Sequence, residues 1–446
     1  MKKLIFPAGT LDDLAARFRQ TDLESFALIL ARPTGASRRD QRLLVQSVHT
    51  PRDDEYEVRS RHEVRPTPAF RLPLEKRARN DRLSIIYCHS HPAQGGTPSF
   101  SGTDDRSEKP LAAYAAERVP GVPHAALLIG AEGIAARELG ARAKVEVWQV
   151  GRNVRRFYPP VGGRVAGIFD RQVRAFGKQG QAAVQSLRIA IGGCGGTGSI
   201  IAQELAYLGV TRFLLIDPDV LSKTNLNRVV GATPADVGRA KVDIAKRMIR
   251  RIAPGAEVVK VKGDVLEREV GQLLLDCDLI FCCTDSDGSR HFINQLAYQY
   301  FIPVFDMGAS ITPDKTGNII SIDGRVQMLG PGMACLICND GIINGRRVMW
   351  DLQSARQRRR DPYFQEIAGV RQPAVISLNG TVASQAVTMF LSAVAGVPVA
   401  ARSIRFRVMR GDARVIHDNP RPGCVNCSSD YFFGKGEQYE LPGRNR

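Results

Sequence analysis

LRIAIGGCGGTGSIIAQELAYLG, residues 187–209, is the stretch that decides the fold of the second half of the chain. An apolar run typical of a buried strand leads into Gly193, Gly195, Gly196 and Gly198, and an apolar helical pattern follows them. Glycines let a backbone approach phosphate closely, and a helix N-terminus attracts the negative charge. The stretch predicts a strand–loop–helix unit that binds a nucleotide.

The segments that follow alternate between strand and helix patterns, and this alternation predicts a parallel sheet with crossover helices. Asp217 ends the next strand, where its carboxylate suits the hydroxyls of a ribose. Taken alone, these features are equally typical of an NAD-dependent dehydrogenase. The alternating segments are RFLLIDPD (212–219), AKVDIAKRMIRRIAP (240–254), DLIFCCTD (278–285) and FINQLAYQYFI (292–302).

Four further segments resemble the ThiF/MoeB/ubiquitin-activating superfamily over about residues 165–430. Members of this superfamily adenylate the C-terminal glycine of ubiquitin-like proteins, so the resemblance favours ATP over NAD. The segments are FDRQVRAFGKQGQ (169–181), IDPDVLSKTNLNRVV (216–230), the helix start at Lys241 and CCTDSDGSRHFIN (282–294).

The resemblance implies a role for each polar residue of these segments. Arg228 and Lys241 neutralise the phosphates, because ATP and a carboxylate otherwise repel each other. Asn225 holds a phosphate or ribose oxygen, and Asp285 holds the magnesium that offsets charge on the leaving pyrophosphate. Arg171, in the entry helix, reaches the nucleotide of a partner subunit, which implies a homodimer.

Two CxxC pairs form a second motif in this half, and four thiolates in two pairs predict a structural zinc site. The superfamily has such a site in the same order. Its members that form a thioester carry a cysteine between the pairs, whereas residues 339–423 contain none here. The sequence thus predicts no internal thioester. The zinc ligands are Cys335, Cys338, Cys424 and Cys427.

The first 150 residues show strand patterns that predict a mixed α/β domain, and one of them runs into YCHSHP (87–92). Side chains at i and i+2 share a face of an extended chain, so His89 and His91 can bind one ion. Asp104 follows a Gly/Pro loop and closes the set from a helix start capped by Ser101. Three protein ligands and an open position are typical of catalytic zinc.

These residues resemble the JAMM (JAB/MPN-type) zinc isopeptidases, whose pattern is an upstream Glu, then H-[ST]-H-P, then S-x-x-D. The resemblance implies that Glu24 activates the water and that Ser101 supports the oxyanion. Twelve residues separate His91 from Asp104, where the family usually has ten. The third ligand is therefore Asp104 or Asp105.

The 446 residues predict an α/β protein of several domains. We expect a JAB/MPN-like domain at 1–150, a linker at 151–168, a Rossmann-like ThiF-type domain at 169–431 and a tail at 432–446. The start turns polar too soon for a signal peptide, which favours a cytoplasmic protein. The uncharged segment 372–401 is long enough to span a membrane, but its polar residues favour a buried helix at a subunit contact.

A formal net charge of +17 favours acidic partners. The one dense basic run, at 346–361, is interpreted as a solvated loop, so no nucleic acid is expected.

The sequence predicts an enzyme that trims a ubiquitin-like protein after its C-terminal glycine with zinc, and then adenylates that glycine with ATP and magnesium. A separate conjugating protein is a possible partner. Three alternatives stay open: an activating enzyme for a sulfur-carrier protein, a nicotinamide dehydrogenase and a basic nucleic-acid scaffold.

Overall fold

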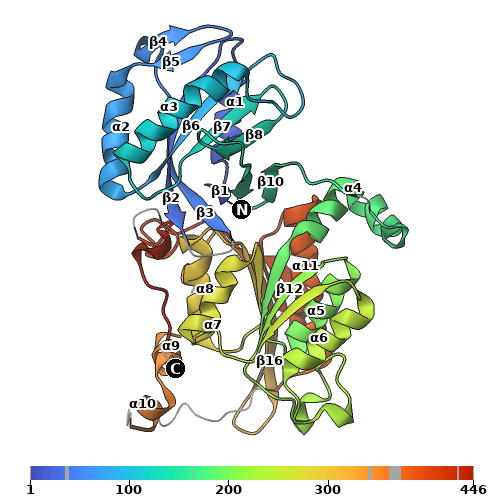
Figure 1. Cartoon of the computed structure of the whole chain (residues 1–446). Helices are drawn as coiled ribbons and strands as arrows, with labels where there is room; N and C mark the ends of the chain where they lie inside the picture. The colour runs from blue at the N-terminus through green and yellow to red at the C-terminus, as the bar shows by residue number, and fades with distance from the viewer. Residues whose placement is uncertain are drawn as a thin grey trace. The chain divides into compact units, whose positions relative to one another are not determined.

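The computed structural model describes residues 2–35, 40–163, 165–339, 344–360, 373–428 and 431–444. The chain forms two compact units (Figure 1). The first contains Met1–Val161 and Gly434–Tyr439, and the second contains Gly162–Phe433 and Glu440–Arg446. Each unit is built around a sheet of eight strands.

The first unit is a mixed sheet with the strand order β10-β9-β1-β3-β2-β6-β7-β8 and a separate ribbon of β4 and β5. Its helices are α1 (Thr10–Phe18), α2 (Pro68–Asp81) and α3 (Gly102–Arg118). Its strands are β1 (Lys2–Pro7), β2 (Phe26–Thr34), β3 (Gln41–His49), β4 (Tyr56–Arg59), β5 (Val64–Pro66), β6 (Ser84–His91), β7 (Ala125–Gly130), β8 (Ile134–Glu138), β9 (Val145–Val150) and β10 (Val154–Tyr158).

Alternation along the central strands divides the core of this unit into two layers. Ile86 and Cys88 of β6 pack in the cluster that includes the buried face of α1. Ile85 and Tyr87 pack on the opposite face, in the cluster that includes α2 and α3. Because side chains alternate with a period of two, the end of β6 presents His89 toward the side of the sheet that α3 covers.

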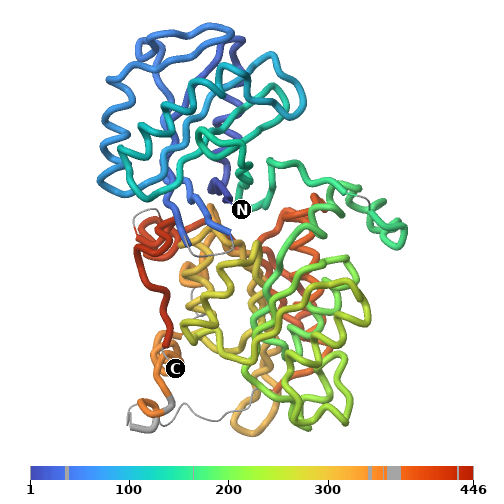
Figure 2. The backbone as a smooth tube through the Cα atoms, viewed as in Figure 1, coloured from blue at the N-terminus to red at the C-terminus, as the bar shows by residue number. Residues whose placement is uncertain are grey.

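A segment from the far end of the sequence completes the first unit (Figure 2). Gln46 of β3 donates from Nε2 to the carbonyl of Gly434 at 2.8 Å. The backbone N–H of Gly35, which follows β2, donates to Oε1 of Glu437 at 3.0 Å. Residues 434–439 therefore lie along the β2–β3 hairpin. The expected tail over 432–446 is thus divided, since residues 434–439 belong to the first unit and 440–446 to the second. The contacts that hold residues 434–439 join positions about 400 residues apart, which local sequence patterns do not show.

The second unit has the strand order β13-β12-β11-β14-β15-β16-β17-β18. Its helices are α4 (Asp170–Ser186), α5 (Gly196–Tyr207), α6 (Lys241–Ile252), α7 (Arg268–Gln272), α8 (Asp287–Gln299), α9 (Gly345–Leu352), α10 (Ala355–Arg360) and α11 (Ile376–Ala395). Its strands are β11 (Arg188–Gly192), β12 (Arg212–Ile216), β13 (Glu257–Val261), β14 (Leu279–Cys282), β15 (Val304–Pro313), β16 (Ile319–Leu329), β17 (Ser403–Arg407) and β18 (Asp412–Val415).

Five strands of this sheet, β11 to β15, run parallel, and β16 to β18 extend it in antiparallel fashion. The chain winds from β11 outward through β12 to β13 and then crosses to β14 on the other side of β11. The strand order therefore reverses between β11 and β14. Ligands of open α/β sheets bind at such a switch point, outside the carboxyl ends of the strands. The predicted α/β fold class, with a largely parallel second sheet, is confirmed.

The uncharged segment forms α11, and residue 372 lies outside the described residues. Among the described residues, α11 is the single helix long and apolar enough to cross a membrane, and half of its apolar window is buried inside the fold. It packs against α4, α5, β15 and β16. These contacts are those of a core helix, whereas its expected position at a subunit contact stays a prediction.

The interpretation of the basic run at 346–361 as a solvated loop is wrong. The run contains most of α9 and all of α10, and residue 361 lies outside the described residues. The side chain of Asn344 caps α9 by accepting from the N–H groups of Arg346 and Arg347. Asn344 lies just before the basic run, and its cap starts α9, whose Val348 is buried.

Candidate active sites

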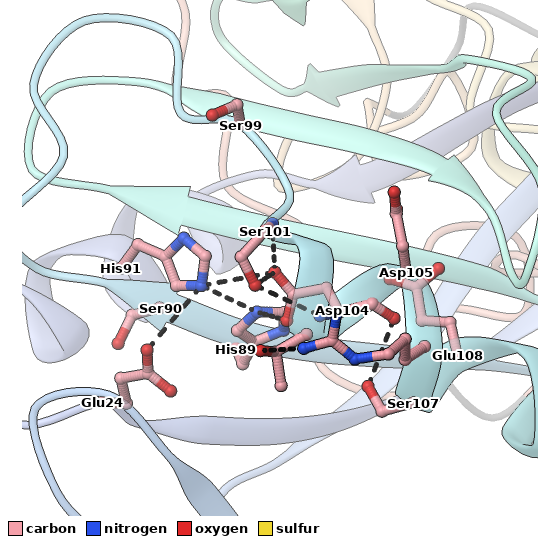
Figure 3. A network of polar contacts seen from close by, with 12 residues as sticks. Glu24, His89, Ser90, His91, Ser99, Ser101, Asp104, Asp105, Ser107 and Glu108 are labelled. Carbon is pink, nitrogen blue, oxygen red and sulfur yellow. Dashed lines mark hydrogen bonds and ion pairs between the residues drawn. The ribbon is translucent and has the colours of Figure 1, made fainter.

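His89, His91 and Asp104 converge at the end of β6 (Figure 3). Nε2 of His89 lies 3.1 Å from Oδ1 of Asp104, and Nε2 of His91 lies 3.5 Å from Oδ2. The two histidine Nε2 atoms are 3.3 Å apart. The predicted pair of histidines on one face is thus present, and the first turn of α3 supplies the carboxylate.

Ser101 fixes the position of Asp104 at the start of α3. The serine hydroxyl accepts from the N–H of Asp104 at 3.1 Å and donates to Oδ2 at 2.8 Å, and the serine N–H donates to the same oxygen at 2.6 Å. This reciprocal arrangement is a capping box. The one hydroxyl proton of Ser101 is used in the cap, so support of an oxyanion by Ser101 requires a rearrangement and stays a prediction.

The three donors fit a zinc ion. Zinc bonds to nitrogen and oxygen ligands are about 2.0–2.2 Å long, so two ligands of a tetrahedral site lie about 3.3–3.6 Å apart. The two histidine Nε2 atoms are 3.3 Å apart, and they lie 3.1 Å and 3.5 Å from different oxygens of Asp104, Oδ1 for His89 and Oδ2 for His91. The pKa of Asp104 is held low: burial opposes ionisation, but the hydrogen bond and charge of His89 outweigh it. Asp104 is therefore an anionic ligand at neutral pH.

Glu24 lies on the open side of this cluster, with Oε1 3.7 Å from Nε2 of His91. Its N–H donates to the carbonyl of Ser60 at 2.8 Å, and the N–H of Ser25 donates to the hydroxyl of Ser90 at 2.8 Å. Burial raises the pKa of Glu24 to about 7, and the charge of His89 opposes this only in part. A carboxylate of this basicity is suited to take a proton from water.

Arg137 distinguishes Asp105 from Asp104. Its Nη1 lies 2.5 Å from Oδ1 of Asp105, and its Nε lies 3.0 Å from Oε2 of the buried Glu108. The guanidinium also stacks 3.9 Å above the ring of Phe100, whose edge meets His89. Asp105 is thereby turned toward Arg137, and Asp104 is the carboxylate that faces the histidines.

We expect Arg137→Gln to weaken zinc binding by roughly tenfold. Arg137 acts on the cluster indirectly, because it holds Asp105, the neighbour of Asp104, and stacks on Phe100, whose edge meets His89. Competition with a chromophoric chelator measures the affinity. The control is Arg106→Gln on the same helix, since Arg106 is exposed and its Nη2 donates to the hydroxyl of Thr103. An unchanged zinc affinity in a folded Arg137→Gln protein would show that Arg137 does not position Asp104.

The predicted nucleotide loop lies between β11 and α5, where three of its glycines are required by close contacts. Gly193 has a φ of +92°, and a Cβ there would lie 2.7 Å from the carbonyl oxygen of Cys283. A Cβ on Gly198 would lie 1.8 Å from the oxygen of Gly193, and one on Gly196 would lie 2.3 Å from Nδ2 of Asn379. Gly195 has open space around its Cβ position, which leaves its backbone accessible to a ligand.

Asp217 stabilises this loop. Its Oδ2 accepts from the N–H of Cys194 at 2.6 Å, and its Oδ1 accepts from the N–H of Asp219 at 2.8 Å. Burial raises the pKa of Asp217, and the charge of Lys241 opposes the rise. The predicted ribose contact is not tested by this geometry, since each carboxylate oxygen can accept a second hydrogen bond.

The predicted cations lie near the loop. Cδ of Arg228 is 3.3 Å from the Cβ position of Gly196. Lys241 begins α6 and its Nζ lies 2.6 Å from Oδ2 of Asp219. Asn225 ends a short helical turn, where its Oδ1 accepts from the N–H of Ser222 at 3.2 Å. The loop, Arg228 and Lys241 are thus brought together by the fold.

Asp285 and Arg171 are placed differently. Asp285 is exposed between β14 and α8, at the carboxyl edge of the sheet beside the glycine loop. Arg171 is exposed on α4, where no ion pair to it is found among the described residues. Its predicted contact with a partner subunit's nucleotide stays a prediction.

Three charged residues near Asp285 were missed in the sequence. Asp306 is completely buried on β15 and forms ion pairs with Arg290 of α8, at 3.5 Å, and with Arg325 of β16. Asp287, at the start of α8, also acts electrostatically on Arg290, so the two arginines and the neighbouring acids form one charged cluster beside the carboxyl end of β14. Arg290 is visible in CCTDSDGSRHFIN, but Asp306 and Arg325 are in strands without any distinguishing motif.

The four predicted cysteines form one cluster in the second unit. The Sγ atom of Cys335 lies 3.7 Å from that of Cys338 and 3.6 Å from that of Cys424. The Sγ atoms of Cys338 and Cys427 are 3.5 Å apart. Zinc–sulfur bonds of about 2.3 Å place tetrahedral thiolates about 3.8 Å apart, so the cluster fits zinc.

We expect Cys335→Ser to reduce the bound zinc from two ions per chain to one and to lower the melting temperature of the second unit. A structural zinc contributes folding free energy directly. Elemental analysis and calorimetry provide the measurements, and Cys277→Ala, a buried cysteine outside the cluster, is the control. Unchanged zinc content and melting would rule out the structural site.

Comparison with known families gives a match between residues 169–426 and the ThiF family. The chain belongs to the ThiF family. Residues 8–146 match the prokaryotic homologs of the JAB domain. The predicted fusion of a JAB-like domain with a ThiF domain is confirmed, and membership of the ThiF family decides against a nicotinamide dehydrogenase.

Three relatives are similar to the ThiF part. The molybdopterin-synthase adenylyltransferase of Escherichia coli is 26% identical over 263 residues, which cover 58% of this chain and 95% of that protein. The adenylyltransferase and sulfurtransferase uba4 of Emericella nidulans is 31% identical over 40% of this chain and 37% of its own length. The SAMP-activating enzyme E1 of Haloferax volcanii is 28% identical over 36% of this chain and 56% of its own length.

Proposed function

We propose that this ThiF-family protein prepares the C-terminus of a ubiquitin-like protein in two steps: it cleaves after the terminal glycine and then adenylates that glycine. The observation that carries the proposal is the convergence of Glu24, His89, His91 and Asp104 in the same chain as the ThiF nucleotide loop. An extended precursor has no free glycine carboxylate, so it cannot be adenylated before it is trimmed.

The cleavage step uses the side chains at the end of β6. A zinc ion held by His89, His91 and Asp104 would supply a Lewis acid that lowers the pKa of water. Glu24 accepts a proton from the attacking water. The water oxygen bonds to the glycine carbonyl carbon, the carbon–nitrogen bond breaks, and the amine leaves with the proton that Glu24 held. The same step on an isopeptide bond would reverse conjugation.

The adenylation step takes place at the glycine loop. The glycine carboxylate bonds to the α-phosphorus of ATP, and the bond between the α-phosphorus and the pyrophosphate oxygen breaks. Two anions must approach each other, and Arg228 and Lys241 supply the neutralising charge near the loop. Asp285 would hold the magnesium ion at the carboxyl edge of the sheet.

The product acyl-adenylate is not passed to a thiol of this chain. Seven of the nine cysteines are buried, and four of the nine belong to the zinc-type cluster. Cys283 is only partly buried, but burial raises its thiol pKa well above the usual value, which removes the reactive thiolate. We therefore assign the next step to an acceptor amine, to a sulfur donor, or to the cysteine of a separate conjugating protein.

The relatives support activation of a carrier protein and also favour a second candidate function. The uba4 relative is named as an adenylyltransferase and a sulfurtransferase, which favours a sulfur-carrier substrate. The two candidates differ in their product: a sulfur carrier ends as a thiocarboxylate, whereas a ubiquitin-like modifier ends in an amide. The proposal includes a homodimer, because Arg171 is exposed on α4 and accessible to a partner subunit. It also includes a cytoplasmic location.

ATP–pyrophosphate exchange with matched substrates tests the proposal. A small ubiquitin-like protein that ends in glycine should support exchange with the wild-type chain and with His89→Ala. The same protein with added residues after the glycine should support exchange with the wild-type chain only. Exchange with the extended protein in His89→Ala would mean that trimming does not precede activation.

A further inference from the structure

A groove between α6 and β13 is lined entirely by charged side chains. Its volume is about 530 Å³. Five of its six lining residues are basic, and one is acidic. Helix α6 is labelled in Figure 1, and β13 is an edge strand of the second sheet. The lining residues are Asp243, Lys246, Arg247, Arg250, Arg251 and Lys260.

The charges of the groove are only partly neutralised. Lys260 pairs with Asp243, and Arg247 forms ion pairs with Asp236 at 2.6 Å. Within the described ranges, Lys246, Arg250 and Arg251 are left without an ion-pair partner. Three positive charges in one concave surface repel each other, so an anionic ligand would lower the free energy of this surface.

The spacing of these cations follows from the helix. Lys246 and Arg250 are four residues apart, as are Arg247 and Arg251, so they form two neighbouring rows on one face of α6. Positions i and i+4 place their Cβ atoms about 5–6 Å apart. The rows begin at Lys246, whereas Lys241, at the start of α6, is not among the residues that line the groove.

The chemistry of the lining favours a phosphate backbone over an acidic protein. Protein–protein interfaces have an apolar, often aromatic core surrounded by a polar rim. None of the residues that line this groove is apolar or aromatic. Backbone contacts to nucleic acid are made by Arg and Lys and need no apolar core. We propose that the groove binds the phosphodiester backbone of a nucleic acid, without regard to base sequence.

The proposal revises the expectation that this protein has no nucleic-acid contact. The dense basic run at 346–361 is the charge cluster that the sequence makes visible, whereas KRMIRR within residues 240–254 predicts only part of a helix. Only the structure shows that these side chains share a groove with Lys260 of the neighbouring strand.

Fluorescence anisotropy with a labelled single-stranded 20-nucleotide RNA tests the proposal in the full chain. With three phosphate contacts, a fourfold rise in salt should weaken binding roughly 20-fold. In Arg250→Gln/Arg251→Gln, affinity should fall, and the same rise in salt should weaken binding only about threefold. Two RNAs of unrelated sequence should bind alike.

Lys76→Gln/Arg79→Gln is the matched control, since both residues are exposed on α2 in the other unit. It removes the same charge and should keep the affinity and salt dependence of the wild-type chain. Circular dichroism establishes that both variants are folded. Absence of RNA binding, an equal loss in the control, or equal competition by poly-glutamate of the same charge would each overturn the proposal.

Discussion

Glu24→Gln is expected to keep zinc in the first unit and to lose cleavage by at least about 100-fold, the lower range for removal of a general base. The substitution keeps the size of the side chain and removes its ability to take a proton. The backbone contacts of residues 24 and 25 to Ser60 and Ser90 do not depend on the carboxylate, so the fold of this segment should be preserved. Elemental analysis gives the zinc content, and mass spectrometry gives the cleavage rate.

The matched control is Glu63→Gln, an exposed carboxylate near Glu24 that pairs with Arg65. It should cleave at the rate of the wild-type chain. Cleavage retained by Glu24→Gln would remove Glu24 as the base. Loss of zinc together with cleavage would assign Glu24 to the metal site instead.

Asp285→Asn is expected to reduce ATP–pyrophosphate exchange by at least about 100-fold, similar to the loss of one group that stabilises the transition state. The asparagine keeps the shape of the side chain but lacks the charge that a magnesium ion requires. Cleavage in the first unit should be unchanged. Exchange of labelled pyrophosphate into ATP measures the effect.

Glu269→Gln is the control for this substitution, because Glu269 is an exposed acid on α7 of the same unit. Normal exchange in Asp285→Asn would reject Asp285 as the magnesium ligand. If both variants lose exchange, the effect comes from the net charge of the unit and carries no information on the magnesium site.

The parts of the fold that depend on local patterns could be predicted from the sequence. The strand that is predicted to run into YCHSHP (87–92) agrees with β6, because an apolar run bounded by turn residues is typical of a buried strand. The alternation of side chains also put His89 and His91 on one face. The glycine loop could also be predicted, because its strand, loop and helix are contiguous in the sequence.

The choice between Asp104 and Asp105 could not be made in this way. It depends on where α3 begins, since successive helical residues point about 100° apart. The capping box of Ser101 sets that start, and Arg137 on β8 forms an ion pair with Asp105. Arg137 is more than 30 residues away in sequence, and no spacing rule connects it with the histidines.

The remaining omissions are also long-range pairings. Asp306 meets Arg325 because β15 and β16 pair in antiparallel register, and Gly434–Tyr439 return to the β2–β3 hairpin from the other end of the chain. Such contacts are set by topology and close packing. A single sequence shows the buried character of these segments but not their partners.

The intact mass of a small ubiquitin-like protein with added residues after its terminal glycine tests the central claim most directly. The protein is incubated with this chain in the absence and presence of ATP and magnesium. We predict loss of the added residues in both cases, and a further mass increase of one AMP group only with ATP and magnesium. Trimming without the AMP group, or AMP on the untrimmed protein, would contradict an enzyme that trims and then activates the same C-terminus.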